Sequence, residues 1–235
     1  MKSSESLTIR VTNFIFDHIR KNQLSSGEGL PSELRTSTEL NVSRGVVREA
    51  FRSLEVAGII EKENGRSPRV GVLNNSFLRH LMVHALLTKQ VSLRQVLELR
   101  ASVEVDAAAM AAERRSENEM QKLWQAVEGM RKSLERTHAF VQHDLRFHHV
   151  INVATGNPLI DIISGAMYES IQESMRLGLT KRRGKDDVLR VVDAHAAIAT
   201  AIEQGNPSQA AQKMRKHFEE TFRALARVEP EPIRS

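Results

Sequence analysis

Three histidines and one aspartate lie on the apolar faces of predicted helices, where they could bind a metal ion. Asp144 and His148 are four residues apart and share a face with apolar neighbours, and His195 and His217 lie on or beside the apolar stripes of two later segments. Burying such groups without partners costs free energy, but one carboxylate and three imidazoles can be satisfied by sharing a divalent cation. This ligand set suits Zn²⁺, Ni²⁺, Mn²⁺ or Fe²⁺ and does not decide among them.

The same residues also have an interpretation without a metal. Taken one at a time, each histidine is more often a hydrogen-bonded core or surface residue than a ligand. His80 and His84 form another pair four residues apart, but no inward-facing carboxylate accompanies them, so we interpret them as surface or packing residues. Residue types and spacing alone therefore leave both interpretations open.

Arg100 is a further inward-facing charge, since apolar residues surround it in helical register. Glu104, four residues later, predicts a simple ion pair with Arg100. The other interpretation is that Arg100 binds the carboxylate of a small organic acid whose remaining oxygens complete the metal's coordination shell. The sequence gives these two interpretations equal weight.

A second group of candidate residues, all arginines, lies nearer the N-terminus. Arg44, Arg48 and Arg52 repeat every four residues and predict one exposed stripe on a helix whose other face is apolar. Guanidinium groups bind guanine edges and phosphates bidentately. A charged stripe on an arbitrary helix is more often only solvated, so the interpretation depends on the neighbouring elements.

Those neighbouring elements are the parts of a winged helix-turn-helix. The sequence predicts helices at 8–22, Ser32–Leu40 and Arg44–Ala57, a turn at 41–43 with Ser43 as N-cap, and short strands at about 59–63 and 69–73. Asn64-Gly65 is a hairpin signal between the strands. Because this plan places its second helix in the DNA major groove, it favours DNA contact by the arginine stripe.

The rest of the chain predicts helices only. From Phe77 to Arg227 the apolar residues follow a helical period, and Gly156-Asn157-Pro158 and Gly205-Asn206-Pro207 mark two of the breaks. Ser116 with Glu119 forms a capping box, and Thr137 is expected to cap the following helix. The fold class is therefore mainly α: a winged helix-turn-helix followed by an all-α bundle of six or seven helices. The expected divisions are residues 1–74, residues 75–229 and a disordered tail at 230–235.

The composition narrows the class of protein. The chain has 235 residues, about 40% of them apolar, a formal net charge of +5 and no cysteine. Disulfides and thiolate metal sites are therefore excluded. No run approaches the roughly 18 apolar residues of a membrane span, and the N-terminus lacks the apolar core of a signal peptide. We expect a cytoplasmic protein with no membrane partner, whose mild positive charge fits a polyanion partner without proving one.

The N-terminal motifs resemble those of the GntR family of bacterial transcription regulators. They are LPSE at 30–33, VSR at 42–44, VREA at 47–50 and LE at 54–55. The resemblance implies that Arg44 and Arg48 contact the operator and that the wing tip, Gly65-Arg66, approaches the minor groove. The family often has a contact arginine directly after Pro-Ser-Glu, but this chain has Leu34 there. Arg35, one position later, is expected to reach a phosphate or to change the local packing.

The helical half resembles the FCD effector-binding domain of the FadR subgroup, which is an antiparallel all-helical bundle. Asp144, His148, His195 and His217 match, in order and spacing, the four positions that metal-binding members use as ligands. An arginine in the segment matching Glu98-Leu99-Arg100 often lies at the effector pocket of these domains. The resemblance thus implies a metal centre with Arg100 beside it.

Together these features predict a ligand-responsive transcription regulator. The simplest form is a repressor of a carbon-catabolic operon that binds a palindromic double-stranded DNA operator as a homodimer. A small organic acid at the metal-containing pocket would release or modulate it. Two alternatives are a regulator whose effector is the metal ion itself and, least favoured, a metal-dependent enzyme. The enzyme is disfavoured because no separate general base or oxyanion donor can be identified.

Overall fold

The chain folds into two compact units, each described by itself. The computed structural model describes residues 6–62, 66–180 and 185–226. The units are Met1–Phe77 and Leu78–Ser235. The boundary expected between residues 74 and 75 lies close to this division, and the tail expected at 230–235 lies outside the described residues.

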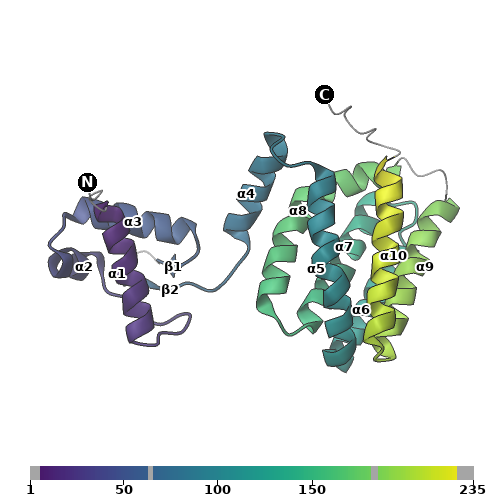
Figure 1. Cartoon of the computed structure of the whole chain (residues 1–235), viewed down its shortest axis with the longest axis horizontal. Helices are drawn as coiled ribbons and strands as arrows, with labels where there is room; N and C mark the ends of the chain where they lie inside the picture. Colours follow the sequence, from purple (N-terminus) through teal and green to yellow (C-terminus); the bar gives the residue numbers. More distant parts are fainter. Residues whose placement is uncertain (1–5, 63–65, 181–184, 227–235) are drawn as a thin grey trace. The chain divides into compact units, whose positions relative to one another are not determined.

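Within residues 6–62 and 66–77, the first unit contains three helices and a two-stranded sheet, before the start of the next helix at its end (Figure 1). They are α1 (Leu7–Lys21), α2 (Glu33–Leu40), α3 (Arg44–Val56), β1 (Ile60–Glu61) and β2 (Arg69–Val70). The strands are antiparallel and pair Ile60 with Val70 and Glu61 with Arg69. Apolar side chains from α1, α3 and β1 form its core, among them Val11, Ile15, Val47, Phe51, Leu54 and Ile60.

The observed strands are shorter than the predicted ones. The ladder ends at Gly71, whose amide donates to the carbonyl of Ile59, and the next amide, that of Val72, is bonded by the Glu61 side chain at 3.0 Å. A Cβ atom at position 71 would lie 2.3 Å from the carbonyl oxygen of Gly58, so only glycine fits there. The close approach of Gly71 to Gly58 and the hydrogen bond from the Val72 amide to Glu61 take the place of the strand pairing that the sequence predicted after residue 70.

Side-chain caps define the helix-turn-helix. The Ser32 hydroxyl accepts a hydrogen bond from the amide of Arg35 at the start of α2, and the Ser43 hydroxyl accepts one from Val46 at the start of α3. Between the helices Asn41 adopts the left-handed conformation, with φ of 51°. These local bonds fix the start of α3, and therefore the direction in which its first residues point.

The second unit is helical in the part of the chain that the structure describes, and all of its helices except the first pack together as a bundle (Figure 1). Its helices are α4 (Ser76–Leu87), α5 (Leu93–Arg114), α6 (Glu117–Arg131), α7 (Thr137–Ala154), α8 (Pro158–Thr180), α9 (Lys185–Glu203) and α10 (Pro207–Ala226). Helix α5 is central, since it packs against α7, α8, α9 and α10. Short connections join the packed pairs α6–α7, α7–α8 and α9–α10, so each pair runs antiparallel. The predicted fold class, a winged helix-turn-helix followed by a helical bundle, is confirmed.

One predicted cap is confirmed and one is wrong. Ser116 and Glu119 form the expected capping box at the start of α6. Thr137, however, is the first residue of α7 and not its cap. Arg136 occupies the cap position, because its carbonyl accepts the first helical hydrogen bond, from the amide of Phe140. Its side chain makes no capping hydrogen bond. The helix therefore begins one position earlier than the threonine suggests.

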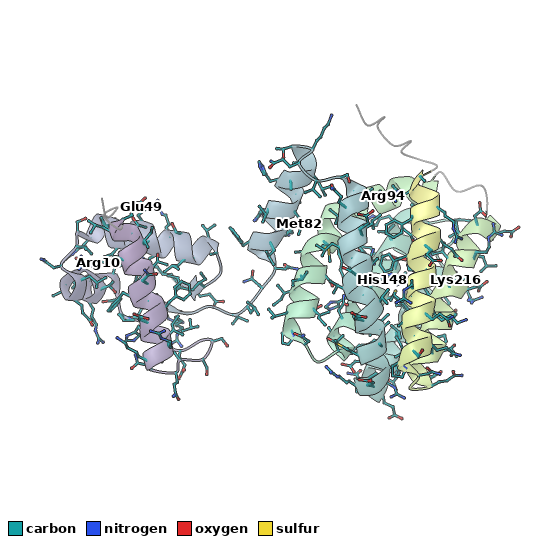
Figure 2. The ribbon with its side chains drawn as sticks, in the orientation of Figure 1. Arg10, Glu49, Met82, Arg94, His148 and Lys216 are labelled. Carbon is teal, nitrogen blue, oxygen red and sulfur yellow. The ribbon has the colours of Figure 1, made fainter. Side chains whose placement is uncertain are left out.

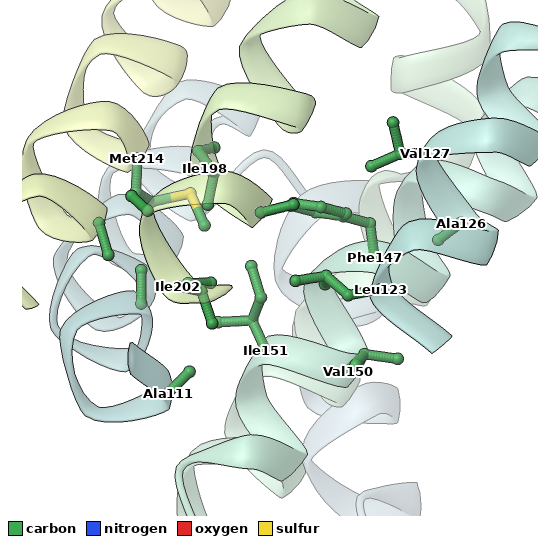
Figure 3. Close-up of a cluster of buried hydrophobic side chains, with 14 of the residues drawn as sticks. Ala111, Leu123, Ala126, Val127, Phe147, Val150, Ile151, Ile198, Ile202 and Met214 are labelled. Carbon is green, nitrogen blue, oxygen red and sulfur yellow. The ribbon is translucent and has the colours of Figure 1, made fainter. Parts of the chain in front are cut away.

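The core of the bundle surrounds a small polar cluster. Figure 3 shows apolar side chains of α6, α7, α9 and α10 meeting in this core. The ring of Phe147 packs edge-on against those of His148 and His195, with centroids 5.5 and 4.7 Å away. These contacts help to bury the two imidazole rings and restrict their rotation. No helix among residues 6–62, 66–180 and 185–226 is long and apolar enough to cross a membrane.

Candidate metal centre and DNA-binding surface

Four residues from three helices converge inside the bundle. Asp144 and His148 lie on α7, His195 on α9 and His217 on α10, and their exposed fractions are 4, 1, 0 and 8%. His148 is labelled within the bundle in Figure 2. The three histidines each offer a ring nitrogen, and these nitrogens lie within 4.8 Å of one another.

The separations between the candidate ligand atoms fit a shared cation. His195 Nε2 is 3.3 Å from His148 Nε2 and 3.0 Å from Asp144 Oδ1. A tetrahedral ion with bonds of about 2.1 Å holds its ligand atoms roughly 3.4 Å apart. The three imidazoles therefore lie close enough to share a divalent ion, while Asp144 approaches His195 closely and lies 3.9 Å from His148 Nε2.

Oxygen atoms beside the other ring nitrogens set the direction of the lone pairs. His195 Nδ1 lies 2.7 Å from the carbonyl oxygen of Val191, which can only accept, so Nδ1 carries the proton. His148 Nδ1 lies 2.5 Å from Glu104 Oε2 at angles outside those of a regular hydrogen bond, and a carboxylate oxygen this close favours a proton on Nδ1. In the neutral rings both Nε2 atoms are then acceptors, and they face each other beside a carboxylate. Asp144 Oδ2 has no hydrogen-bond partner among the described residues. A cation shared between these acceptors would satisfy them, and so would a proton on His195 Nε2 facing Asp144 Oδ1.

Arg100 lies beside this cluster and is 3% exposed. Its Nε donates to Glu104 Oε1 at 2.6 Å, so the ion pair expected from their spacing is present. The guanidinium carbon lies 4.9 Å from the centroid of the Tyr168 ring and 5.5 Å from that of Phe218. The aromatic faces and the carboxylate hold the guanidinium inside the bundle.

The charges of the buried groups follow from their surroundings. Burial raises the pKa of Glu104, but Arg100 and His148 oppose burial more strongly, and the pKa falls to about 2. Asp144 responds in the same way, since its histidine neighbours and Arg100 lower its pKa more than burial raises it. Burial lowers the pKa of His148 and, more strongly, that of His217. With neutral imidazoles the cluster carries one net negative charge.

Glu104 makes a second contact that its spacing from Arg100 did not predict. Its spacing from Arg100 predicted the ion pair, but its second oxygen contacts His148 on another helix. That contact depends on how α5 packs against α7, which α5 alone does not reveal. The available signal was an inward-facing carboxylate on the same face as Arg100.

The arginine stripe of α3 is exposed, as its spacing predicted. Arg44, Arg48 and Arg52 point away from the apolar core, and Ser43 caps the helix just before Arg44. Arg48 Nε lies 3.5 Å from Glu33 Oε2, while Glu33 Oε1 lies 2.5 Å from Lys62 Nζ. The carboxylate of α2 thus contacts one cation of α3 and one that follows β1.

The remaining DNA-contact candidates have different surroundings. Arg35 is exposed and lies 3.6 Å from Glu39 on its own helix, and Leu34 beside it is 54% exposed. Arg66 is exposed, whereas Gly65, its partner at the predicted wing tip, lies outside the described residues. The roles predicted for these residues in DNA binding stay predictions.

A cleft of about 930 Å³ lies elsewhere on the helical unit. Residues of α6 line it together with His143 of α7 and Glu203 of α9, and Trp124 Nε1 donates to Glu203 Oε1 at 3.0 Å. None of the candidate metal ligands lines this cleft, and neither does Arg100. The cleft and the buried cluster are separate features.

Comparisons with known proteins cover nearly the whole chain. The FCD domain matches residues 95–220, and the description "Bacterial regulatory proteins, gntR family" matches residues 8–70. The HTH-type transcriptional regulator LutR of Bacillus subtilis (strain 168) is 27% identical over 204 residues, which are 85% of this chain and 92% of that protein. The HTH-type transcriptional repressor NanR of Cronobacter sakazakii (strain ATCC BAA-894) is 26% identical over 213 residues, 87% of this chain and 79% of that protein.

Two solved structures share the fold. A Streptococcus agalactiae GntR structure superposes with a TM-score of 0.59 at 21% identity, and covers 92% of this chain and 99% of its own. The E. coli McbR/YncC structure has a TM-score of 0.52 at 15% identity, with coverages of 96% and 99%. At these identities the likeness concerns the fold alone.

Proposed function

Because the chain belongs to the gntR family of bacterial regulators and carries an FCD domain, it is a DNA-binding transcriptional regulator, and we propose that a small organic acid controls it through a metal centre. We further propose that it is a repressor, as the relative NanR is named, and that it acts on a carbon-catabolic operon. Asp144, His148, His195 and His217 would bind the ion, and Arg100 the acid.

The observation that carries the proposal is the convergence of acceptors beside a buried arginine. Two imidazole Nε2 atoms and the Asp144 carboxylate face one space, and the cluster has one net negative charge when the imidazoles are neutral. A divalent cation would change that net charge to one positive. A monoanionic carboxylate beside Arg100 would then neutralise it. Since net charge inside a protein is unfavourable, cation and acid should each favour binding of the other.

For the DNA-binding half we propose that Arg44 and Arg48 read the operator. Both are exposed at the start of α3, where the helix of a winged helix-turn-helix enters the major groove. Arg52, Arg35, Arg66 and the Ser43 cap would support this contact through phosphates or local geometry. Two copies of the chain would present these residues to the halves of a palindromic operator, so a homodimer is part of the proposal.

Two other accounts of the buried cluster make different demands. A metal-sensing regulator would respond to the cation without an acid, and Arg100 would have no ligand to bind. A metal-free cluster would need a proton on His195 Nε2, which would then pair with Asp144. Enzymatic activity is not proposed, because the family and the relatives are transcriptional regulators.

A thermal-shift experiment on the full chain tests the proposal. The protein is stripped with a chelator, then loaded with Zn²⁺ or Ni²⁺, and each form is screened against sugar acids, hydroxy acids and dicarboxylates. We expect the cation to raise the melting temperature, and an acid to raise it further in the loaded form only. His217→Ala should lose both responses, whereas His80→Ala, at an exposed histidine, should keep them.

The outcomes separate the accounts. Equal responses to acids in stripped and loaded protein would show that the acid site does not depend on the ion. Lack of metal uptake by the wild type would favour the protonated His195–Asp144 pair. Operator release by the cation alone, measured by fluorescence anisotropy, would favour the metal sensor.

A further inference from the structure

Glu104 contacts both the proposed acid-binding arginine and a proposed metal ligand. Its Oε1 accepts from Arg100 Nε at 2.6 Å, and its Oε2 lies 2.5 Å from His148 Nδ1. The side chain is fully buried and comes from α5, whereas His148 comes from α7. One carboxylate therefore connects two functional side chains on different helices.

We infer that Glu104 is a positioning residue that fixes the tautomer of His148 and thereby prepares its Nε2 to bind the cation. A carboxylate only accepts hydrogen bonds, so a neutral His148 beside it carries its proton on Nδ1. The Nε2 atom of His148 then carries no proton and presents its lone pair, and it lies 3.3 Å from His195 Nε2. The inference rests on the metal centre proposed above and adds to it a residue that does not touch the ion.

Arg100 explains why replacing one oxygen atom of Glu104 by nitrogen should change the tautomer of His148. Arg100 requires an acceptor opposite its Nε, and Oε1 of Glu104 meets that need. In a Glu104→Gln variant the amide oxygen would face Arg100, which places the amide nitrogen opposite His148 Nδ1. That nitrogen donates, so the proton of His148 would move to Nε2 and its lone pair would no longer face the cation position.

The first measurement compares metal affinity in matched variants of the full chain. Glu98 is the control, because it pairs with Arg94 on the same helix at the same spacing, with 3.0 Å between Nε and Oε1, but lies on the surface. Competition with a chromogenic chelator should show that Glu104→Gln weakens Zn²⁺ and Ni²⁺ binding about 10- to 100-fold. Glu98→Gln should bind as the wild type does. A folded Glu104→Gln protein with wild-type affinity would overturn the inference.

The second measurement does not depend on the variant folding. In metal-free wild-type protein labelled with ¹⁵N-histidine, long-range ¹H–¹⁵N correlation reports which nitrogen of His148 is protonated. A proton on Nδ1 supports the inference, and a proton on Nε2 overturns it. If the wild type binds neither ion, the proposed metal centre fails, and the tautomer alone decides the inference about Glu104. The two failures are therefore distinguishable.

Discussion

Glu33, in the DNA-binding unit, joins three elements through one carboxylate. It begins α2, and it contacts Arg48 on α3 and Lys62, which follows β1. The hydrogen bond from Lys62 lowers the pKa of Glu33, and Arg48 adds to this against the opposing effect of burial. The ionised carboxylate therefore restrains a residue that we propose to read DNA.

The first prediction concerns the pH dependence of this contact. Because the folded state lowers the pKa of Glu33 below 4.5, its stabilisation is fully present above pH 4.5 and is lost as the pH falls through the lower folded-state value. Glu33→Gln should therefore destabilise the first unit at pH 7, by less than about 1 kcal/mol since the partners are exposed. Urea unfolding should show this difference shrinking in acid. A difference that persists below the folded pKa would contradict the account.

The burial of the four metal-ligand candidates was predictable from their helical spacing, whereas spacing left open whether they bind a metal, which only the resemblance to FCD domains favoured. Asp144 and His148 needed only the period of one helix. The orientation of each ring was not predictable, since it depends on partners from elsewhere, such as Glu104 for His148. For His195 the partner is the carbonyl of Val191, one turn earlier, and main-chain acceptors leave no trace in residue types.

At the scale of elements, α3 presents the proposed recognition surface. Arg48→Ala should reduce binding to an operator selected from a random DNA pool at least about fivefold, because a bidentate base contact is worth about 1–3 kcal/mol. Metal content should not change. Arg20→Ala removes the same charge from α1 and should alter binding only through salt-dependent attraction. Fluorescence anisotropy measures both variants. Unchanged operator selectivity in Arg48→Ala would reject its role as a base reader.

The packing of α6 on α7 depends on the absence of a side chain at Gly129. A Cβ atom at Gly129 would lie 2.3 Å from His143 Nδ1 on α7. Gly129→Ala should therefore lower the stability of the helical unit by about 1–2 kcal/mol, as overpacking does. In a His143→Ala background the same change should instead stabilise it by up to about 1 kcal/mol, because alanine is the better helix former. Thermal unfolding of the four proteins tests this reversal, and the same sign in both backgrounds would contradict it.

The predicted breaks between helices were correct where the sequence contains Gly-Asn-Pro. Gly156 and Gly205 adopt φ of 66° and 64° at the breaks where Gly-Asn-Pro sequences were noted. The prediction for Thr137 failed because the helix starts one residue earlier, where the Arg136 carbonyl accepts the first helical hydrogen bond from Phe140. The strands were predicted too long, because Gly71 packs closely against Gly58. A contact between two residues so far apart in the sequence is not visible in the local alternation of residue types.

For the whole molecule, the proposal requires the buried cluster to influence operator binding. Effector coupling in proteins is typically about 1–3 kcal/mol, or roughly 5- to 150-fold in affinity. The acid found in the thermal screen should therefore weaken operator binding at least about fivefold in metal-loaded protein, and have no effect after chelation. Anisotropy titrations with and without the acid provide the test. An equal effect in stripped protein would separate acid binding from the metal centre.

The burial of the candidate ligands would also limit the rate at which a bound ion could leave. Asp144, His148, His195 and His217 are at most 8% exposed and come from three helices, so solvent cannot replace them one by one while the bundle stays closed. An ion held there would leave at the rate at which the helices separate, whatever its equilibrium affinity. Such an ion would remain bound through large changes in the free metal concentration. Slow exchange of this kind suits a permanent part of an acid receptor better than a gauge of ambient metal.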